Sequence, residues 1–111
     1  MAAIKALMPS QREKKRYLAF EAIAEKEFAN SIMKLVVREI TKFLGELGMA
    51  KAGIMIIPTQ KNNQGILRID HKHVNEVKAA LTLIKEIDNQ QVIVRSLGVS
   101  GILNKAQVYT R

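Results

Sequence analysis

Apolar side chains recur along the first half of the chain with two different periods. Residues 17–24 (YLAFEAIA) place them at every second position, which is the period of a β-strand, although this segment also has helical propensity. In residues 32–47 they recur at steps of three and four, which predicts one apolar face of a helix. Asn30 and Ser31 are suitable N-caps for that helix, and Gly48 is expected to end it.

The second half repeats the alternation of strand and helix patterns. Residues 53–58 (GIMIIP) and 66–70 (ILRID) predict two strands joined by a short polar turn, which together form a hairpin. Asp70 or a residue just after it is expected to cap a helix whose apolar positions lie between 74 and 87. A polar break then precedes a fourth strand that begins at Val92.

The resulting order, β-α-β-β-α-β, predicts an α+β fold of the ferredoxin-like type shared by RNA-recognition domains. It consists of a four-stranded antiparallel sheet with two helices on one face. We expect a flexible N-terminal arm over residues 1–11 and a single domain over residues 12–111. Residues 102–111 are compatible with either a short strand or a helical turn. Apolar side chains on the open face of the sheet would form a patch that needs covering.

The segment 92–101 (VIVRSLGVSG) combines a buried-strand pattern with two glycines. A run of β-branched residues interrupted by Arg95 predicts a core strand. Gly98 and Gly101, with Ser100 between them, predict a tight loop after that strand. No GK[ST] sequence accompanies the glycines, so a nucleotide-binding phosphate loop is disfavoured.

Composition and motifs argue against most catalytic classes. The chain has no cysteine, nucleophile elbow, Walker A loop or zinc-ligand set, and its only histidines, His71 and His73, are spaced to point to different faces of a helix start. We therefore expect no protein active site, no metal site and no cofactor bound by the protein. The absence of cysteine, of a signal-peptide pattern and of a long apolar run favours a cytoplasmic protein without membrane contact.

The chain is basic, and its positive charge is concentrated at its two ends. It has 18 Lys and Arg residues against 10 Asp and Glu residues, a formal net charge of +8, and most of the excess lies in residues 1–16 and 89–111. This distribution predicts a polyanion partner, most often a nucleic acid. The strands offer few aromatic residues for base stacking, so contacts should run mostly from Lys and Arg to phosphate. The candidate RNA-binding residues are Arg12, Lys14, Lys15, Arg16, Arg68, Arg95, Ser100 and Lys105.

Structural alternatives stand beside these candidates. Arg68 and Arg95 each interrupt an apolar strand, so they either face outward opposite the helices or one of them forms an internal salt bridge to Glu21 or Asp70. The basic run in residues 12–16 is equally compatible with a solubilising flank of the first strand. A second set of candidates surrounds the glycines and is expected either to contact a protein partner or to close the domain's own core. This set is Leu97, Gly98, Val99, Gly101 and Ile102.

Five motifs between residues 11 and 103 resemble the ribonuclease P protein component 2 family, small subunits of archaeal ribonuclease P that have a eukaryotic counterpart. In order, they are QREKKRYLAFEA, LGELGMAKA, GILRIDHKHVNEV, AALTLIKEI and VIVRSLGVSGIL. The chain departs from the family pattern after LGVSG, where Ile102 stands in place of the usual threonine and Lys105 is the only nearby basic residue.

The resemblance implies a non-catalytic subunit of a ribonucleoprotein that removes the 5′ leader of precursor tRNA, in which the RNA is the catalyst and uses Mg²⁺. It also implies four partners: the ribonuclease P RNA, precursor tRNA nearby, a protein subunit of the TIM-barrel type, and a second copy of this chain. Two other functions remain open for the same fold, a stand-alone RNA-binding domain and a small-molecule regulatory domain.

Overall fold

The computed structural model describes residues 14–28 and 30–110. The predicted arm over residues 1–11 and the candidate Arg12 lie outside these residues. The elements, in chain order, are β1 (Lys15–Ile23), α2 (Met33–Ala52), β2 (Met55–Ile57), β3 (Gln64–Asp70), the 3₁₀ helix η2 (His71–His73), α3 (Val74–Leu83), β4 (Glu86–Ile87), β5 (Gln90–Gln91), β6 (Ile93–Ser100) and α4 (Leu103–Val108).

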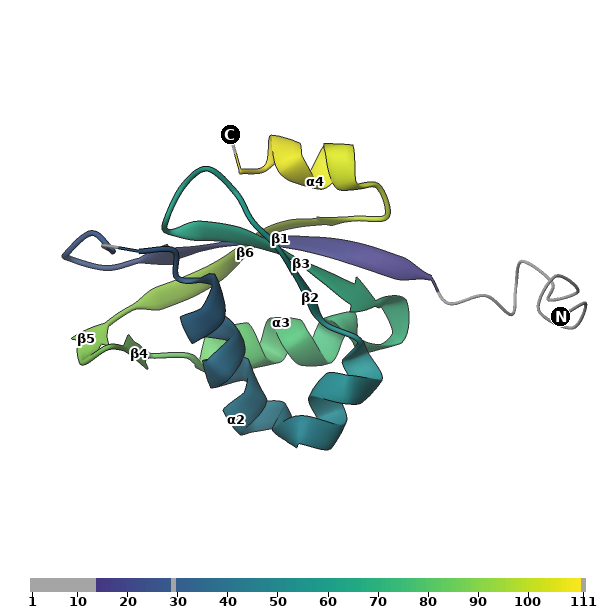
Figure 1. Ribbon diagram of the computed structural model, residues 1–111, viewed down its shortest axis with the longest axis horizontal. Helices are drawn as coiled ribbons and strands as arrows, with labels where there is room; N and C mark the ends of the chain where they lie inside the picture. The colour runs from purple at the N-terminus through teal and green to yellow at the C-terminus, as the bar shows by residue number, and fades with distance from the viewer. Residues whose placement is uncertain (1–13, 29, 111) are drawn as a thin grey trace, which may run out of the picture.

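One antiparallel sheet of four strands organises the fold. Its strand order is β2-β3-β1-β6, with α2 and α3 on one side and α4 on the other (Figure 1). The predicted ferredoxin-like order is therefore confirmed, with two additions: the small β4–β5 hairpin before β6, and α4. No described helix is long and apolar enough to cross a membrane.

The central strand β1 carries the middle of the core. It pairs with β3 on one side and with β6 on the other, so the helical alternative for residues 17–24 is wrong. Leu18 and Phe20 point to the helix side and are fully buried against a cluster that includes Val36, Ile40 and Leu81. Their alternation with the residues between them is the period-two pattern that predicted the strand.

Glycines shape the far end of α2 differently from the prediction. The expected stop at Gly48 is wrong, because the helix continues through it to Ala52. Gly53 ends the helix in the left-handed conformation, with φ 59°, and donates its N–H to two carbonyls of the last turn. Gly45, with φ 72° and ψ 167°, interrupts the helix at a kink, a backbone conformation that only glycine adopts readily.

The two expected helix starts turned out differently. The N-cap of α2 is Ile32, which makes no side-chain cap bond, so the N-cap expected at Asn30 or Ser31 is wrong, although the Ser31 hydroxyl accepts a hydrogen bond from the N–H of Met33 at 3.4 Å. The Asp70 carboxylate accepts one from the N–H of Lys72 at 3.0 Å, so the predicted cap at Asp70 is confirmed.

Helix α3 is shorter than the apolar pattern of its sequence predicted. It ends at Leu83, whereas the apolar positions were expected to run to 87. Ile87 is buried, but it lies in β4 of the small hairpin. Asp88 and Asn89 take positive φ values of 52° and 64° in the hairpin turn, a conformation that short polar residues tolerate.

The predicted loop after the fourth strand is also wrong. β6 continues through Ser100, and Gly98 pairs with Ala19 within the ladder. The ladder shifts register between Ser96 and Gly98, so Leu97 is the extra residue of a β-bulge. Gly98 has no positive φ; a Cβ built on it would lie only 2.6 Å from the ring of Tyr109. Glycine at 98 therefore makes room for that ring.

Helix α4 decides between the two alternatives for residues 102–111. The chain turns after β6 and lays this helix on the sheet face opposite α2 and α3 (Figure 1). Ala106 is fully buried there against Ala19 and Ile66, and Leu97 and Leu103 pack around them. The patch expected on the open face therefore exists, and α4 covers its centre.

Candidate nucleic-acid interface

The antiparallel register gathers basic residues from distant parts of the chain at one end of the sheet. There β1 begins beside the last residues of β3 and β6, with Lys15 opposite Asp70 and Tyr17 opposite Arg68. We call this region the basic end. Its cations are Lys14, Lys15, Arg16, Arg68 and Lys72.

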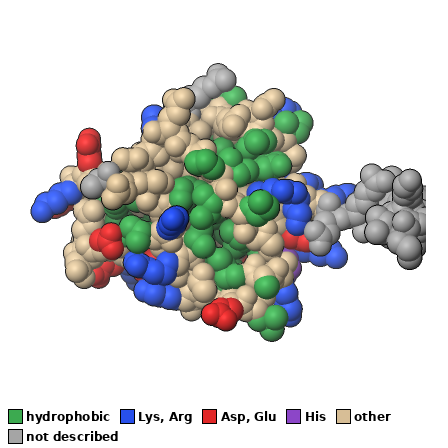
Figure 2. All heavy atoms as spheres, viewed as in Figure 1, with side chains coloured by type: hydrophobic (Ala, Val, Ile, Leu, Met, Phe, Trp, Pro, Cys, Tyr) green, Lys and Arg blue, Asp and Glu red, His purple; other side chains and the backbone are tan. Residues whose placement is uncertain are grey.

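The basic end forms a compact surface. Figure 2 shows Lys and Arg side chains gathered at the end of the body from which β1 starts. Within the described residues, the register places one carboxylate, Asp70, beside these five cations, so positive charge prevails there. Such a surface suits the phosphate groups of a nucleic acid, which accept hydrogen bonds and carry negative charge.

Asp70 stabilises the η2 turn, which carries His71 and Lys72. The hydrogen bond that Asp70 accepts from the N–H of Lys72 lowers the pKa of Asp70 below its ordinary value. The nearby charges of His71, Lys15 and His73 lower this pKa further. His71 donates its backbone N–H to the carbonyl of Lys14 at 2.8 Å. The backbone of His71 therefore ties the start of β1 to the η2 turn, and the ionised Asp70 carboxylate stabilises that turn.

Arg16 is oriented by the backbone of its own strand. Its Nη1 donates to the carbonyl oxygen of Lys15 at 3.0 Å, and the guanidinium group lies over Gly101. A Cβ on Gly101 would be 3.5 Å from that Nη1, an ordinary contact distance. Gly101 therefore leaves space beside the guanidinium, although its position does not require glycine.

Arg68 lies on the outer face of the sheet, between Met55 and Tyr17 in the register. Its Nη1 lies 3.6 Å from the sulfur atom of Met55, and no described carboxylate forms an ion pair with it. Its Nε is removed from solvent without a hydrogen-bond partner in the described part of the chain. The guanidinium of Arg68 therefore has no anionic partner among the described residues. Ser100 shares this row, opposite Tyr17.

Arg95 does not join this group. It lies opposite Glu21, and its Nε and Nη2 both contact Oε1 of that carboxylate at 2.5 Å. The structure combines the two alternatives, because Arg95 faces outward, with its side chain 60% exposed, and also forms the salt bridge to Glu21, which is therefore not internal. The residues that pack under α4, which include Ala19, lie between Arg95 and the basic end. Lys105, the remaining candidate, is exposed on α4.

The glycine-block candidates divide in the same way. Leu97 packs beside Ala19 under α4, Val99 packs against the helix-side core, and Gly98 lies under the ring of Tyr109. These three residues thus serve the domain's own packing, which was the alternative to a partner contact. Gly101 and Ile102 remain exposed, Ile102 at 54%.

Base stacking on the sheet, as in RNA-recognition domains, is blocked at its centre. Ala106 of α4 covers Ala19 and Ile66, the residues that a stacked base would have to approach. Phe20 is buried on the opposite face, and Tyr17 is half-buried. The surface is therefore suited to phosphate contacts more than to base readout.

Sequence reasoning missed Lys72 as a member of this surface, because only its neighbours His71 and His73 were considered, and those as ordinary helix-start polarity. The available signal was the position of the DHKH run directly after a strand expected to pair with the strand that begins in KKR. The described residues hold no cluster of three or more His, Asp or Glu side chains that could bind a metal ion.

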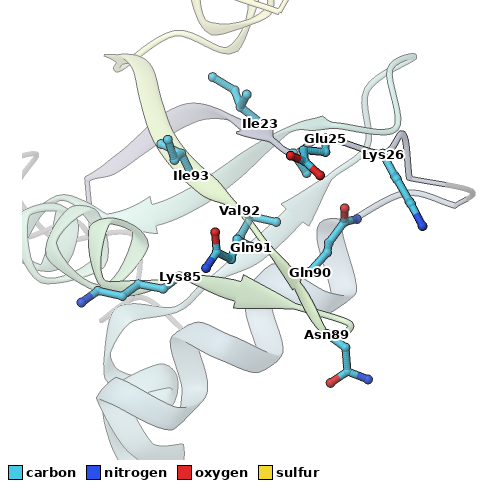
Figure 3. A pocket seen from close by; sticks show the side chains of 10 residues that line it. Ile23, Glu25, Lys26, Lys85, Asn89, Gln90, Gln91, Val92 and Ile93 are labelled. Carbon is cyan, nitrogen blue, oxygen red and sulfur yellow. The ribbon is translucent and has the colours of Figure 1, made fainter.

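A groove of about 900 Å³ lies at the other end of the sheet, where β1 and β6 diverge (Figure 3). Its lining includes Ile23, Lys26, Lys85, Gln90, Gln91 and Ile93. It is open, and its lining holds the two cations together with the carboxylate of Glu25, so it is distinct from the basic end in both place and charge.

Comparisons with known proteins give the same family as the motifs. A family model described as the Rpp14/Pop5 family matches residues 16–111. Ribonuclease P protein component 2 of Thermococcus gammatolerans is 44% identical over 103 residues, covering 91% of this chain and 86% of the relative. The protein of the same name from Pyrococcus furiosus is 40% identical over 103 residues, with the same two coverages.

The fold also has a counterpart among solved structures. A chain in the cryo-EM structure of yeast ribonuclease MRP superimposes with a TM-score of 0.57, covering 89% of this chain and 87% of that chain. Its sequence identity is 11%, so the match supports the ferredoxin-like fold alone.

Proposed function

Because the chain belongs to the Rpp14/Pop5 family, we propose that it is a protein subunit of ribonuclease P, the ribonucleoprotein that removes the 5′ leader of precursor tRNA. The observation that carries the proposal is the family match over nearly the whole described domain. The basic end agrees with it, since a subunit of a ribonucleoprotein needs a surface for phosphate groups.

In this proposal the protein supports the RNA and makes or breaks no bond itself. Lys14, Arg16, Arg68 and Lys72 neutralise phosphates of the ribonuclease P RNA near the precursor-tRNA site. Lys15 and Asp70 position the turn from which Lys72 projects. The catalyst is the RNA with its Mg²⁺ ions, and neutralising nearby phosphates lowers the Mg²⁺ concentration that the RNA needs to fold and react.

The same proposal extends to protein partners. A TIM-barrel-type subunit and a second copy of this chain are the partners that the family resemblance implies, in a cytoplasmic complex. The stand-alone RNA-binding alternative is less well supported, because α4 occupies the sheet centre where bases would stack. No described feature favours a small-molecule regulatory domain over these.

Reconstitution tests the proposal directly. Ribonuclease P RNA and the remaining protein subunits are combined with and without this chain, and precursor-tRNA cleavage is measured at limiting Mg²⁺. We expect omission of the chain to reduce cleavage and addition of high Mg²⁺ to restore part of it. Equal cleavage with and without the chain at every Mg²⁺ concentration would refute the proposed function.

A further inference from the structure

The two edges of the main sheet are protected to different degrees. The β2 edge has only three residues and is followed by Pro58, which has no N–H to offer another strand. The β6 edge has eight residues. Along β6 the bulge at Leu97 disturbs the later part of the edge, whereas the stretch from Ile93 to Ser96 precedes the bulge.

The hydrogen-bond pattern shows which backbone groups this stretch presents outward. The N–H of Ala22 points to β3, where it donates to the carbonyl of Asn63 at 2.7 Å. Glu21 and Ile23 must then point toward β6, so their partners Arg95 and Ile93 point back toward β1. The backbone groups of Val94 and Ser96 therefore point away from the sheet.

The β4–β5 hairpin independently supports this assignment. The N–H of Val92 donates outward to the carbonyl of Lys85 at 2.9 Å, directly after β4 pairs with β5. β4 thus begins a fifth strand beside the chain that becomes β6, and this strand stops at Lys85. In the described part of the chain, no backbone group continues it along Val94 and Ser96.

The side chains around this free edge are apolar on the outer face and positive at its end. Ile93 is 65% exposed, beside its cross-strand partner Ile23, which is 45% exposed. Arg95 is balanced by Glu21, whereas no described carboxylate forms an ion pair with Lys85. A polypeptide strand matches the alternating N–H and C=O groups of the edge, and an RNA backbone does not.

We propose that the outer edge of β6 at Val94 and Ser96 accepts an extended segment of a partner protein, which continues the strand that β4 begins. The segment carries an apolar side chain beside Ile93 and an acidic side chain beside Lys85. The inference rests on the proposed function, because the ribonucleoprotein assembly supplies the partner. It differs from that function in assigning a protein contact to the edge opposite the β2 side, away from the basic end.

Hydrogen exchange of the full chain tests the edge in four samples. They are the chain alone at low and at high concentration, the chain with ribonuclease P RNA, and the chain in the complete assembly with the other protein subunits. We expect exchange at Val94 and Ser96 to slow about tenfold or more only in the complete assembly. Slowing at high concentration alone would indicate a second copy, and slowing with RNA alone would indicate an RNA contact; either result overturns the proposal, as does unchanged exchange in the assembly.

Variants provide the second readout. Ser96→Pro removes an outward N–H and leaves the β1 ladder intact, so we expect its incorporation into the assembly to fall about tenfold. Ser96→Ala should be incorporated as well as the parent chain. Lys85→Glu should weaken entry about threefold, and Lys78→Glu, on the exposed surface of α3, should not. Parent-like entry of both Ser96→Pro and Lys85→Glu overturns the edge proposal alone. Failure of the parent chain itself to enter the assembly overturns the proposed function, and the edge proposal with it.

Discussion

The contact between Gly98 and Tyr109 gives a prediction whose size follows from the structure. In Gly98→Ala the new Cβ would lie 2.6 Å from two ring atoms of Tyr109, which is too close for any real contact. Either the ring stays and the site is overpacked, at a cost of about 1–3 kcal/mol, or the ring swings away and loses its packing. Tyr109 is 44% exposed, so about half of a ring side chain of roughly 200 Å² is buried. At about 25 cal/mol per Å² the lost burial is at most ~2.5 kcal/mol.

Overpacking thus predicts a free energy of unfolding lower by about 1–3 kcal/mol, and displacement of the ring predicts a decrease within the same range. Urea denaturation of the full chain measures it, and with a slope of about 2 kcal/mol per M the midpoint should fall by roughly 0.5–1.5 M. Gly101→Ala is the matched control, because its new Cβ would meet nothing closer than 3.5 Å. We expect that control to remain within about 0.5 kcal/mol of the parent chain.

A double-mutant cycle separates the contact from any general effect of alanine in β6. Once Tyr109→Ala has removed the ring, adding Gly98→Ala should cost close to nothing. The reasoning is refuted if Gly98→Ala unfolds at the parent midpoint, if Gly101→Ala costs as much, or if the cost of Gly98→Ala persists without the ring.

Three further predictions concern charge, pH and backbone conformation. Replacing Lys14 and Arg16 with alanine should weaken association with ribonuclease P RNA and reduce its salt slope by about 2, whereas Arg95→Ala, which removes a cation already paired with Glu21, should change the slope less; equal slopes for the two variants would contradict the role of the basic end. The lowered pKa of Asp70 means that its contribution to stability is complete above its ordinary value of 3.8 and is lost as pH falls through the folded-state pKa, so thermal melting against pH should lose part of its acid dependence in Asp70→Asn; an unchanged profile would contradict this. Gly45→Ala should lower the free energy of unfolding in urea by about 1–3 kcal/mol, because the kink needs a glycine conformation; a neutral result would mean that the kink straightens without cost.

Local patterns along the chain were sufficient for the framework of the fold. The alternation in β1 and the helical repeats of α2 and α3 depend on which side of each element meets the core, and that information is local. Asp70 was recognisable as a cap for the same reason, since its side chain bonds a neighbour only two residues away.

The remaining features depend on residues that are far apart in the sequence. Gly98 looked like a loop residue because the residue that it contacts, Tyr109, lies at the end of α4, eleven positions later in the sequence. Gly48 resembled a helix stop, although the helix actually bends at Gly45 and ends before Gly53. Local sequence does not specify which glycine takes the unusual conformation when several are close together.

The candidate RNA-binding surface shows the same division. Clustered cations at the start of β1 and Arg68 were candidates from the sequence, and the strand register places them together. Lys72 joins them from the η2 turn that follows β3. Arg95 resembled Arg68 in sequence context, yet a one-residue bulge and the position of Glu21 gave it a carboxylate partner. Register is a tertiary property, so it determined which candidates meet.

The central place of β1 has a consequence for how the molecule folds and opens. Leu18 pairs with Leu67 on one side and with Val99 on the other, so the first strand of the sheet depends on the last. Closing the longer loop costs only about 0.4 kcal/mol more than closing the shorter one, so neither ladder has a large entropic advantage. Among the described strands, loss of β1 would leave β6 without a partner in the sheet and β3 with the three-residue β2 alone. The sheet should therefore open as one cooperative unit, in which the amide protons of β1 exchange with solvent only when the whole domain unfolds.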